Sequence, residues 1–503
     1  MSKLWRALWR THFFAGLVIA PALLWFAFTG LIILYTDPVD EALNGDVMTV
    51  RVGDEEVPLD AQLATIQDEN PDWELASVTP GRRPDRANAF TMTDDQGVNR
   101  VVYVDQYTGS ITGVITSDTG LVAFANRTHG SFLPRQYTMP IPSLTGMIGD
   151  GPAFIDVEVG EVIVEIVAGW GLVLAITGIY LWWPRPGTRK RLFIPRFKEG
   201  GRPMWRDLHA SGGTVLSVGL VFFVVTGLPW ATFWGNEFST LASKITPNTE
   251  NFWEYSGPAS NIPKVGDLTR FGVTVPWATA NDSIPTSDDD GHGGHHHSSD
   301  DGSETATPRP APAETVGLEA AYRAAQAEGM KPGFSITPPV DTVVDDGSTA
   351  YGAYVVINPW PSSLGEQGAL YLDQFTAKTL GTSDSSTWGG IQRITEFGVQ
   401  THMGTQFGLI NRILLTSICV LVVWNVVTAV VMWSRRRRSG TLGAPRKPVD
   451  ERTQRSVGVF QLILSLIYPL WGASLLLVLA AQRLRNRLSG RSDGLLAAAS
   501  VDG

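Results

Sequence analysis

HFFAGLVIAPALLWFAFTGLIILY, residues 12–35, decides the fold of this chain, and HASGGTVLSVGLVFFVVTGLPWATFW, residues 209–234, repeats its pattern. In both stretches a histidine opens an uncharged apolar run, and a Thr-Gly pair follows seventeen residues later, at Thr29 and Thr226. Each run is long enough to cross a bilayer as a helix. At about 1.5 Å of rise per residue, each histidine lies roughly 25 Å from its Thr-Gly pair. The two features are therefore expected at opposite faces of a membrane.

Further apolar runs at 157–183, 409–434 and 457–482 alternate with polar segments, which indicates an integral membrane protein. The first run follows basic residues, as the apolar part of a signal peptide does. However, it is longer than such a segment, and the Tyr-Thr-Asp-Pro sequence after it is a poor cleavage site. We therefore interpret the first run as a retained anchor.

Lysine and arginine residues close to the runs predict their orientation. They fill the short segment 184–208 and occur again at 435–438, after the fourth run. These flanks and the N-terminus are therefore expected in the cytoplasm, and the long segments 36–156 and 236–408 outside it. The long segments carry most of the acidic residues behind the formal net charge of −10.

The fifth run contains Pro469 at its middle and is followed by Arg483, Arg485 and Arg487. A single span would place the C-terminus outside, whereas a re-entrant hairpin would return these arginines to the cytoplasm. The sequence leaves both arrangements open.

The two long segments contain the same small α+β unit, with cores at 50–113 and 314–383. Each unit has a helical pattern followed by strand patterns. Each ends in a Tyr-x-Asp-Gln-aromatic-Thr motif, at residues 103–108 in the first unit and 371–376 in the second. The repeating element of the chain is therefore a span, an outer unit and a returning span.

Strands that end in Asp-x-x-Thr-Gly, within domains inserted between spans of the His…Thr-Gly kind, resemble the PepSY-associated transmembrane family. This family includes bacterial ferric-siderophore reductases and iron-regulated membrane proteins, and the resemblance extends to about residue 434. It implies a membrane α-helical bundle of four core spans plus a fifth C-terminal hydrophobic segment. Two extracytoplasmic α+β PepSY-like domains are inserted between the spans, and the expected location is the bacterial cytoplasmic (inner) membrane.

The expected order along the chain is as follows: first span 1–35, outer domain 36–156, second span 157–183, basic loop 184–208, third span 209–235, outer region 236–408, fourth span 409–434, basic loop 435–456, fifth span or re-entrant hairpin 457–482, and tail 483–503.

Four histidines, His12, His129, His209 and His402, each precede one of the first four spans. The alternating direction of the spans places His12 and His209 at the cytoplasmic face and His129 and His402 at the outer face. Neutral imidazoles that face one another across a helix bundle typically hold a six-coordinate haem. Glycines one turn after a histidine, Gly16 and Gly213, would leave room for the flat macrocycle. Two b-type haems are therefore predicted, one for each pair.

Each histidine could instead have no role in metal binding, because a lone imidazole at a membrane interface often bonds only to lipid headgroups. His402, in THMGTQFG, resembles the His-x-Gly pattern of the family. His129 lies nearly thirty residues before the second span, behind an insertion that departs from the family spacing. Met403, Met139 or Met147 would be a substitute ligand if His129 does not bind.

Two acidic features have alternative interpretations. The low-complexity tract 282–313 is expected to be a disordered loop, and its histidines, among aspartates, would bind a divalent metal weakly or simply be solvated. The histidines of the tract are His292, His295, His296 and His297. Glu158, Glu161 and Glu165, on one face of the second span, would form a solvated first turn or guide iron or protons.

The sequence contains no dinucleotide-binding turn, no Walker loop and no convincing hydrolase or zinc motif, and nothing indicates nucleic-acid binding. A quinol or a cytoplasmic reductase would therefore supply the electrons. The predicted function is two-haem electron transfer across the membrane to an outer acceptor. By resemblance, this acceptor is a ferric siderophore, which releases ferrous iron when it is reduced. Trp253, Tyr255, Trp277 and Trp360 are candidate docking aromatics.

Two alternatives remain open. The outer units would regulate proteases or bind metal, with the spans as a simple anchor and no redox activity. An iron-chelate permease is disfavoured, because the spans lack a central polar pathway beyond the histidines.

Overall fold

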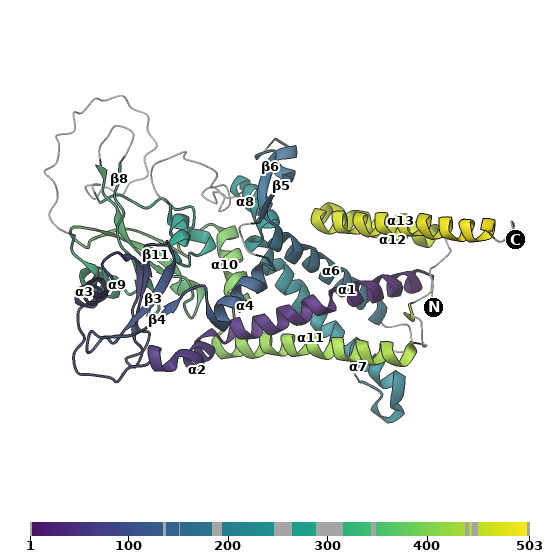
Figure 1. Cartoon of the computed structure of the whole chain (residues 1–503), viewed down its shortest axis with the longest axis horizontal. Coiled ribbons are helices and arrows are strands. Elements are labelled where there is room, and N and C mark those ends of the chain that lie inside the picture. Colours follow the sequence, from purple (N-terminus) through teal and green to yellow (C-terminus); the bar gives the residue numbers. More distant parts are fainter. Residues whose placement is uncertain are drawn as a thin grey trace.

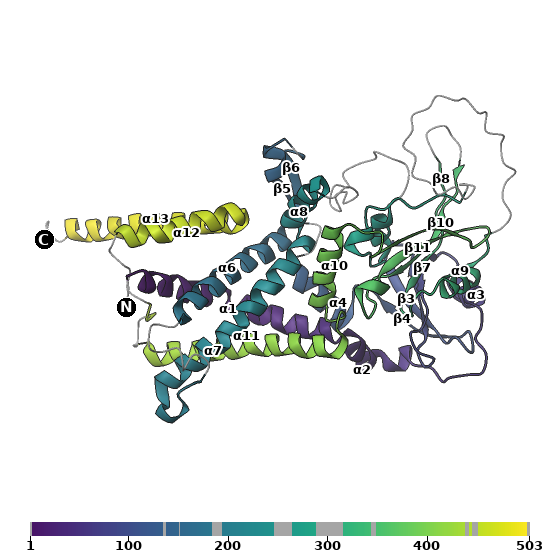
Figure 2. The ribbon, with the colours of Figure 1, turned by 180° about the vertical axis from the view of Figure 1, so that it is seen from behind.

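The computed structural model describes residues 3–133, 137–149, 151–183, 194–245, 264–287, 315–343, 349–437, 442–444 and 451–499. Figures 1 and 2 show a bundle of long helices with a β-sheet domain beyond one of its ends. A helical hairpin near the C-terminus lies beside the opposite half of the bundle. The histidine tract falls at residues outside the described ranges.

The bundle consists of α1 (Lys3–Leu34), α6 (Val159–Trp182), α7 (Gly201–Gly227) and α11 (Gly408–Arg436). Each is long and apolar enough to cross a membrane, α7 together with the 3₁₀ turn Leu228–Trp230. In cyclic order, α1 packs on α6, α6 on α7, α7 on α11, and α11 on α1. This up-down-up-down arrangement places α1 diagonally across from α7, and α6 diagonally across from α11.

The end of the bundle away from the sheet is rich in basic residues. The Arg436 guanidinium, at the end of α11, lies over the rings of Trp9 and Phe13 of α1, at 5.0 and 4.9 Å from their centroids. Before the apolar part of α7, Arg196 pairs with Asp207 at 2.6 Å. At this end the apolar helices of the bundle become amphipathic. Aromatic and basic side chains of this kind are typical of a membrane interface.

The two predicted outer units join into one antiparallel eight-stranded sheet. Its strand order is β12-β11-β10-β7-β1-β2-β3-β4, and the two units meet where Val78 of β1 pairs with Ile336 of β7. The strands of the first unit are β1 (Glu74–Thr79), β2 (Asn88–Thr93), β3 (Asn99–Val104) and β4 (Ile111–Thr116). Those of the second are β7 (Ser335–Thr337), β10 (Ala353–Asn358), β11 (Gly368–Asp373) and β12 (Thr379–Asp384). One apolar core, to which both units contribute, lies under the sheet.

The helices of the two units cap each other reciprocally. Asp60, in the first turn of α3 (Leu59–Glu69), accepts hydrogen bonds from the backbone N–H groups of Leu318 and Glu319, at 2.7 and 3.0 Å. Glu319, in the first turn of α9 (Leu318–Ala327), accepts one from the N–H of Leu59 at 3.1 Å. Each carboxylate therefore satisfies the free N–H groups at the start of the other unit's helix.

Each edge strand leads into a short helix that carries a histidine toward the bundle. After β4 comes α4 (Gly120–Gly130), which contains His129, and after β12 comes α10 (Gly390–His402), which ends at His402. From α10 the chain enters α11 almost directly. After α4, a hairpin of β5 (Thr138–Pro142) and β6 (Phe154–Glu158), with the short helix α5 (Leu144–Met147) at its tip, precedes α6. The insertion in the sequence is this hairpin.

The fifth apolar run forms two helices that fold back on one another, α12 (Glu451–Ile467) and α13 (Pro469–Ala499). The break falls at Tyr468 and Pro469, because proline cannot continue the hydrogen bonding of α12. Tyr468 and Trp471 pack against α6. The hairpin form is therefore the arrangement of this segment in the structure. Two further α-helices in the described ranges are α2 (Thr36–Met48), after α1, and α8 (Thr232–Ile245), after α7.

Candidate functional site

The four histidines outside the tract form two pairs at different levels of the bundle. We call His12 and His209 the sheet-distal pair, and His129 and His402 the sheet-proximal pair. His12 on α1 and His209 on α7 face each other across the bundle diagonal, with ring centroids 6.4 Å apart and ring planes at 83°. His129 and His402 are close enough to influence each other electrostatically.

Every one of the four imidazoles is bonded through Nδ1 to a threonine of another helix. In the sheet-distal pair, His12 Nδ1 lies 2.9 Å from Thr177 Oγ1 of α6, and His209 Nδ1 lies 3.1 Å from Thr428 Oγ1 of α11. His209 Nδ1 also lies 3.2 Å from the carbonyl oxygen of Asn425. In this pair, the diagonal helices α1 and α7 supply the histidines, and the other two helices, α6 and α11, supply the threonines.

The sheet-proximal pair repeats this arrangement with the roles of the helices changed. His129 Nδ1 lies 2.9 Å from Thr29 Oγ1 of α1, and His402 Nδ1 lies 2.8 Å from Thr226 Oγ1 of α7. Here α1 and α7 supply the threonines, and the short helices α4 and α10 supply the histidines. Desolvation by the surrounding protein lowers the pKa of His129 to about 4, and desolvation together with His129 lowers the pKa of His402 to about 3. Both rings are therefore neutral at pH 7.

The threonines decide which ring nitrogen carries the proton. Each hydroxyl donates its hydrogen to the backbone carbonyl four residues earlier, as Thr29 does to Trp25 at 2.9 Å and Thr226 to Phe222 at 2.8 Å. Thr177 and Thr428 make the same bond within α6 and α11. The hydroxyl oxygen can then only accept from Nδ1–H. The neutral ring keeps its lone pair on Nε2, which is the form that binds a metal.

The glycine after each of three threonines gives the imidazole its space. A Cβ on Gly30 would lie 3.2 Å from His129 Cε1, and one on Gly178 would lie 3.3 Å from His12 Cε1. Gly227 lies in the same way beside His402. Gly16 and Gly213, which the sequence suggests as room for a macrocycle, instead face Leu174 of α6 and Asn425 of α11.

The sheet-distal pair fits two axial ligands of one metal. Metal–imidazole bonds of about 2 Å on both sides of an ion would place the two ring centroids roughly 6 Å apart, close to the spacing of His12 and His209. Both rings are only partly buried, so open space adjoins them. Two neutral imidazoles on opposite helices, each oriented by a second hydrogen bond, match the ligand set of a six-coordinate haem. The donor chemistry of the sheet-proximal pair is the same.

The other candidate residues are placed as follows. His292, His295, His296 and His297, together with Trp253 and Tyr255, lie outside the described residues. Trp277 is buried against Trp388, so it cannot serve as an exposed docking aromatic. Trp360 packs against Trp230 at 6.4 Å between ring centroids.

Glu161 and Glu165 do not form a solvated turn. Both are buried, and they cap the first turn of α8. Glu161 accepts from the N–H of Thr232, and Glu165 accepts from the N–H of Phe233, at 2.8 and 3.0 Å. The helical spacing of these glutamates brings both to one face of α6, and that face is covered by α8.

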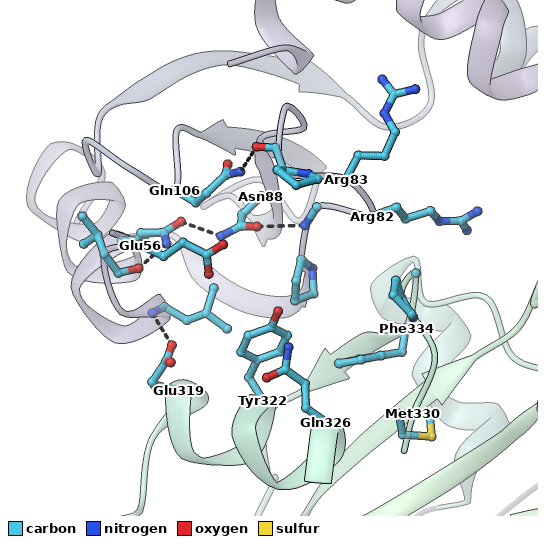
Figure 3. A pocket seen from close by; sticks show the side chains of 18 residues that line it. Glu56, Arg82, Arg83, Asn88, Gln106, Glu319, Tyr322, Gln326, Met330 and Phe334 are labelled. Carbon is cyan, nitrogen blue, oxygen red and sulfur yellow. Dashed lines mark hydrogen bonds between the residues drawn. The ribbon is translucent and has the colours of Figure 1, made fainter. Parts of the chain in front are cut away.

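A cavity of about 190 Å³ lies between side chains of the two units of the sheet domain, at the end of the molecule away from the bundle (Figure 3). One wall carries Asn88 and Gln106 of the first unit, and the other carries Tyr322 and Phe334 of the second. Gln106 donates to the carbonyl of Pro84 at 2.7 Å, but its buried Oε1 has no partner among the residues that the structure describes. The lining includes none of the four paired histidines.

Fold and geometry together define a multi-pass membrane protein in which two repeats each supply two spans and half of a large sheet. The sequence matches the family described as PepSY-associated TM region over residues 9–436, and the chain belongs to this family. A search of curated proteins gives no match. The family match and the four long apolar helices together show a multi-pass membrane protein of the PepSY-associated kind.

Proposed function

We propose that the chain binds two haems, one between His12 and His209 and one between His129 and His402. In this proposal the chain transfers electrons across the membrane. The observation that carries this proposal is the fourfold repetition of one small arrangement: imidazole Nδ1 to threonine hydroxyl to helix carbonyl. A histidine that only met lipid headgroups would not need its tautomer fixed. Four fixed tautomers in two pairs suit four metal ligands.

A haem held by His12 and His209, or by His129 and His402, would supply a reversible one-electron couple. The residues of this chain hold the ligands and set their basicity, because each threonine accepts the Nδ1 proton and so increases the electron density on Nε2. The two pairs are separated by the rise from His12 to Thr29, roughly 25 Å of helix. They therefore lie at two depths of one membrane, as a relay across it requires.

The basic end of the bundle supports an orientation. Arg196, Arg206 and Arg436 lie at the end away from the sheet, and cytoplasmic flanks are rich in arginine and lysine. We place the sheet domain outside the cytoplasm, in the inner membrane of a bacterium. Electrons would then enter from the cytoplasmic side or from the quinol pool and leave at the sheet-proximal pair.

The proposed acceptor is a ferric siderophore, as the family resemblance implies. Ferrous iron is held less tightly than ferric iron by hard oxygen ligands, so reduction would release iron for uptake. The chain would then be a haem-dependent ferric reductase. A second candidate, a non-redox module that binds a ligand or regulates a protease outside the cell, is favoured by one observation: the cavity between the two units lies away from both histidine pairs.

The absorption spectrum of the purified protein tests the proposal directly. A preparation from haem-sufficient cells should show the sharp reduced band of six-coordinate haem, and H12A with H209A should lose part of it. T214V is a matched control on α7, because the Thr214 hydroxyl donates to the carbonyl of Ala210 in its own helix, at 2.8 Å. A colourless preparation would exclude the haem proposal and leave the binding module. Reduced haem in vesicles that release no iron from a ferric siderophore would exclude only the acceptor.

A further inference from the structure

A buried polar cluster lies where α6, the start of α8 and the turn of the C-terminal hairpin meet. Its members are Glu165, Trp234, Tyr468 and Trp471. Glu165 is 2% exposed, and Tyr468 and Trp471 are each 1% exposed. The hairpin that supplies Tyr468 and Trp471 lies beyond residues 9–436, the part of the chain that matches the family.

Among the residues that the structure describes, no partner is present for one polar atom of each member of the cluster. Glu165 Oε1 accepts from the N–H groups of Phe233 and Trp234, at 3.0 and 3.4 Å, but its Oε2 has no hydrogen-bond partner within the described ranges. The same holds for the hydroxyl of Tyr468 and for the indole Nε1 atoms of Trp234 and Trp471. Buried polar groups are almost always paired, because burial without a partner costs free energy. Four orphaned groups together therefore point to something that completes them.

Contacts through Tyr468 and Gly169 connect the four residues. Gly169, one turn after Glu165 on the same face of α6, touches both Trp471 and Tyr468, and a Cβ there would lie 2.7 Å from Trp471 Cβ. The rings of Trp234 and Tyr468 are 5.9 Å apart between centroids, and Glu165 acts electrostatically on the Tyr468 hydroxyl. Trp170 closes the cluster on another side, at 5.3 Å from Trp471 between ring centroids. Three tryptophan rings and one tyrosine ring are therefore grouped beside the buried carboxyl of Glu165.

This set of groups suits a flat aromatic molecule with an oxygen at each end. The indole N–H groups and the phenol can donate to a carbonyl oxygen, and the free oxygen of Glu165 can accept from an O–H group. The rings provide stacking surfaces. Leu466 and Ile467, immediately before Tyr468, are 71% and 56% exposed, so an apolar face continues from the cluster toward lipid. The ligand therefore has a polar aromatic head and can enter from the membrane.

We infer that this cluster binds the headgroup of a quinol or quinone from the bilayer. The inference rests on the proposed function, for which it would supply the electron donor. The cluster also adjoins the bundle interior, because Ala15, three residues after His12, packs in the same apolar core as Tyr468 and Trp471. An ordered water network is the competing occupant.

Quinone binding to the purified full-length protein in lipid nanodiscs tests the inference. Decylubiquinone is titrated, and tryptophan fluorescence is followed, because Trp170, Trp234 and Trp471 would be quenched by a bound quinone. We expect saturable quenching and a Kd that rises about tenfold in Y468F, the loss of one hydrogen bond to the ligand. E165Q keeps the shape of the side chain and should also weaken binding. Y180F is the matched control, since Tyr180 is exposed on the same helix, and it should leave Kd unchanged.

No saturable quenching, or equal affinity in Y468F, E165Q and Y180F, would overturn the inference and leave ordered water as the occupant. If E165Q does not fold, Y468F and W471F still decide the question. The absorption spectrum of the same samples separates this result from the haem proposal. Haem without quinone binding removes only the quinone site, and quinone binding without haem removes only the electron relay.

Discussion

The two histidine pairs contain the same residues in the same hydrogen bonds, but they are built from different parts of the molecule. The sheet-distal pair needs only the four spans, because its histidines lie on α1 and α7 and its threonines on α6 and α11. The sheet-proximal pair takes its histidines from α4 and α10, which follow the edge strands of the sheet. The position of its histidines therefore depends on the fold of the sheet domain, whereas the position of the sheet-distal histidines depends only on the bundle.

This difference makes α1 and α7 the shared elements. Each carries a histidine for one pair and a threonine for the other, which is why His and Thr-Gly recur seventeen residues apart in both helices. The seventeen-residue spacing therefore corresponds to the distance along the bundle between the two histidine pairs. Of the two other spans, α6 and α11, each carries a threonine that bonds to a histidine at only one level, Thr177 in α6 and Thr428 in α11.

The largest expected effect is the loss of one site at a time. H209A should abolish haem binding at the sheet-distal pair and retain it at the sheet-proximal pair, because a six-coordinate haem needs both axial ligands. H402A should give the reverse. Haem per protein, measured from the reduced absorption spectrum, should fall by about half in each variant. Loss of all haem in H209A alone would show that the pairs are not independent.

A pH effect should distinguish the pairs next. Glu396, on α10, is fully buried, and its Oε1 accepts from the N–H of Ala278 at 3.0 Å. Desolvation raises the pKa of Glu396 from 4.5 to about 7. The folded state therefore binds the proton more tightly than the unfolded state, and stability falls as the pH rises from 4.5 to 7, by about 3 kcal/mol in total.

The unfolding temperature in detergent should thus be higher at pH 5 than at pH 8, and haem at the sheet-proximal pair should be lost first at pH 8. E396Q removes the titrating group and should flatten this dependence. E366Q, in the partly exposed 3₁₀ turn Leu364–Glu366, is the control. An unchanged pH dependence in E396Q would assign the effect to another group.

Threonine substitutions should have intermediate effects, and they should differ between the pairs. T226V removes the described oxygen partner of His402 Nδ1, whereas in T428V the carbonyl of Asn425 remains 3.2 Å from His209 Nδ1. Loss of a partner behind a metal ligand typically weakens binding 10- to 100-fold, so about this much is expected for T226V. T428V should have a smaller effect. The rate at which haem leaves each variant can be measured by its transfer to apomyoglobin. Equal rates of haem loss in T226V and T428V would mean that the Asn425 carbonyl does not help to hold the His209 ring.

The sequence predicts much of this architecture. The apolar runs correspond to the four long helices, and the repeated motif at residues 103–108 and 371–376 ends matching strands β3 and β11. The turns after them even share a left-handed residue, Gly109 in the first unit and Ala377 in the second. Hydrophobic periodicity and local turn chemistry are sufficient for these features, because both act over a few residues.

The sequence does not predict how the repeats join or what the threonines do. The pairing of β1 with β7 links residues far apart in the chain, and the alternating patterns of strands do not reveal which edges meet. In the sequence, a threonine followed by glycine, as at 29, 177 and 226, indicates close packing of helices. Its second role becomes visible only in the structure, where each of these threonines bonds to a histidine of another helix. The recurrence of threonine on all four spans was the available signal.

The smallest expected effect concerns the joint between the two units. D60A removes the acceptor of the Leu318 and Glu319 N–H groups, and E319A removes that of Leu59, so each should lower the free energy of unfolding of the sheet domain by about 1 kcal/mol. Because only the sheet-proximal pair depends on this domain, heating should release its haem at a lower temperature and leave the sheet-distal haem unaffected. Circular dichroism and the haem spectrum, followed together, measure both transitions. D68A, at the exposed end of α3, is the control, and a common shift of both haems would mean that bundle and sheet unfold as one unit.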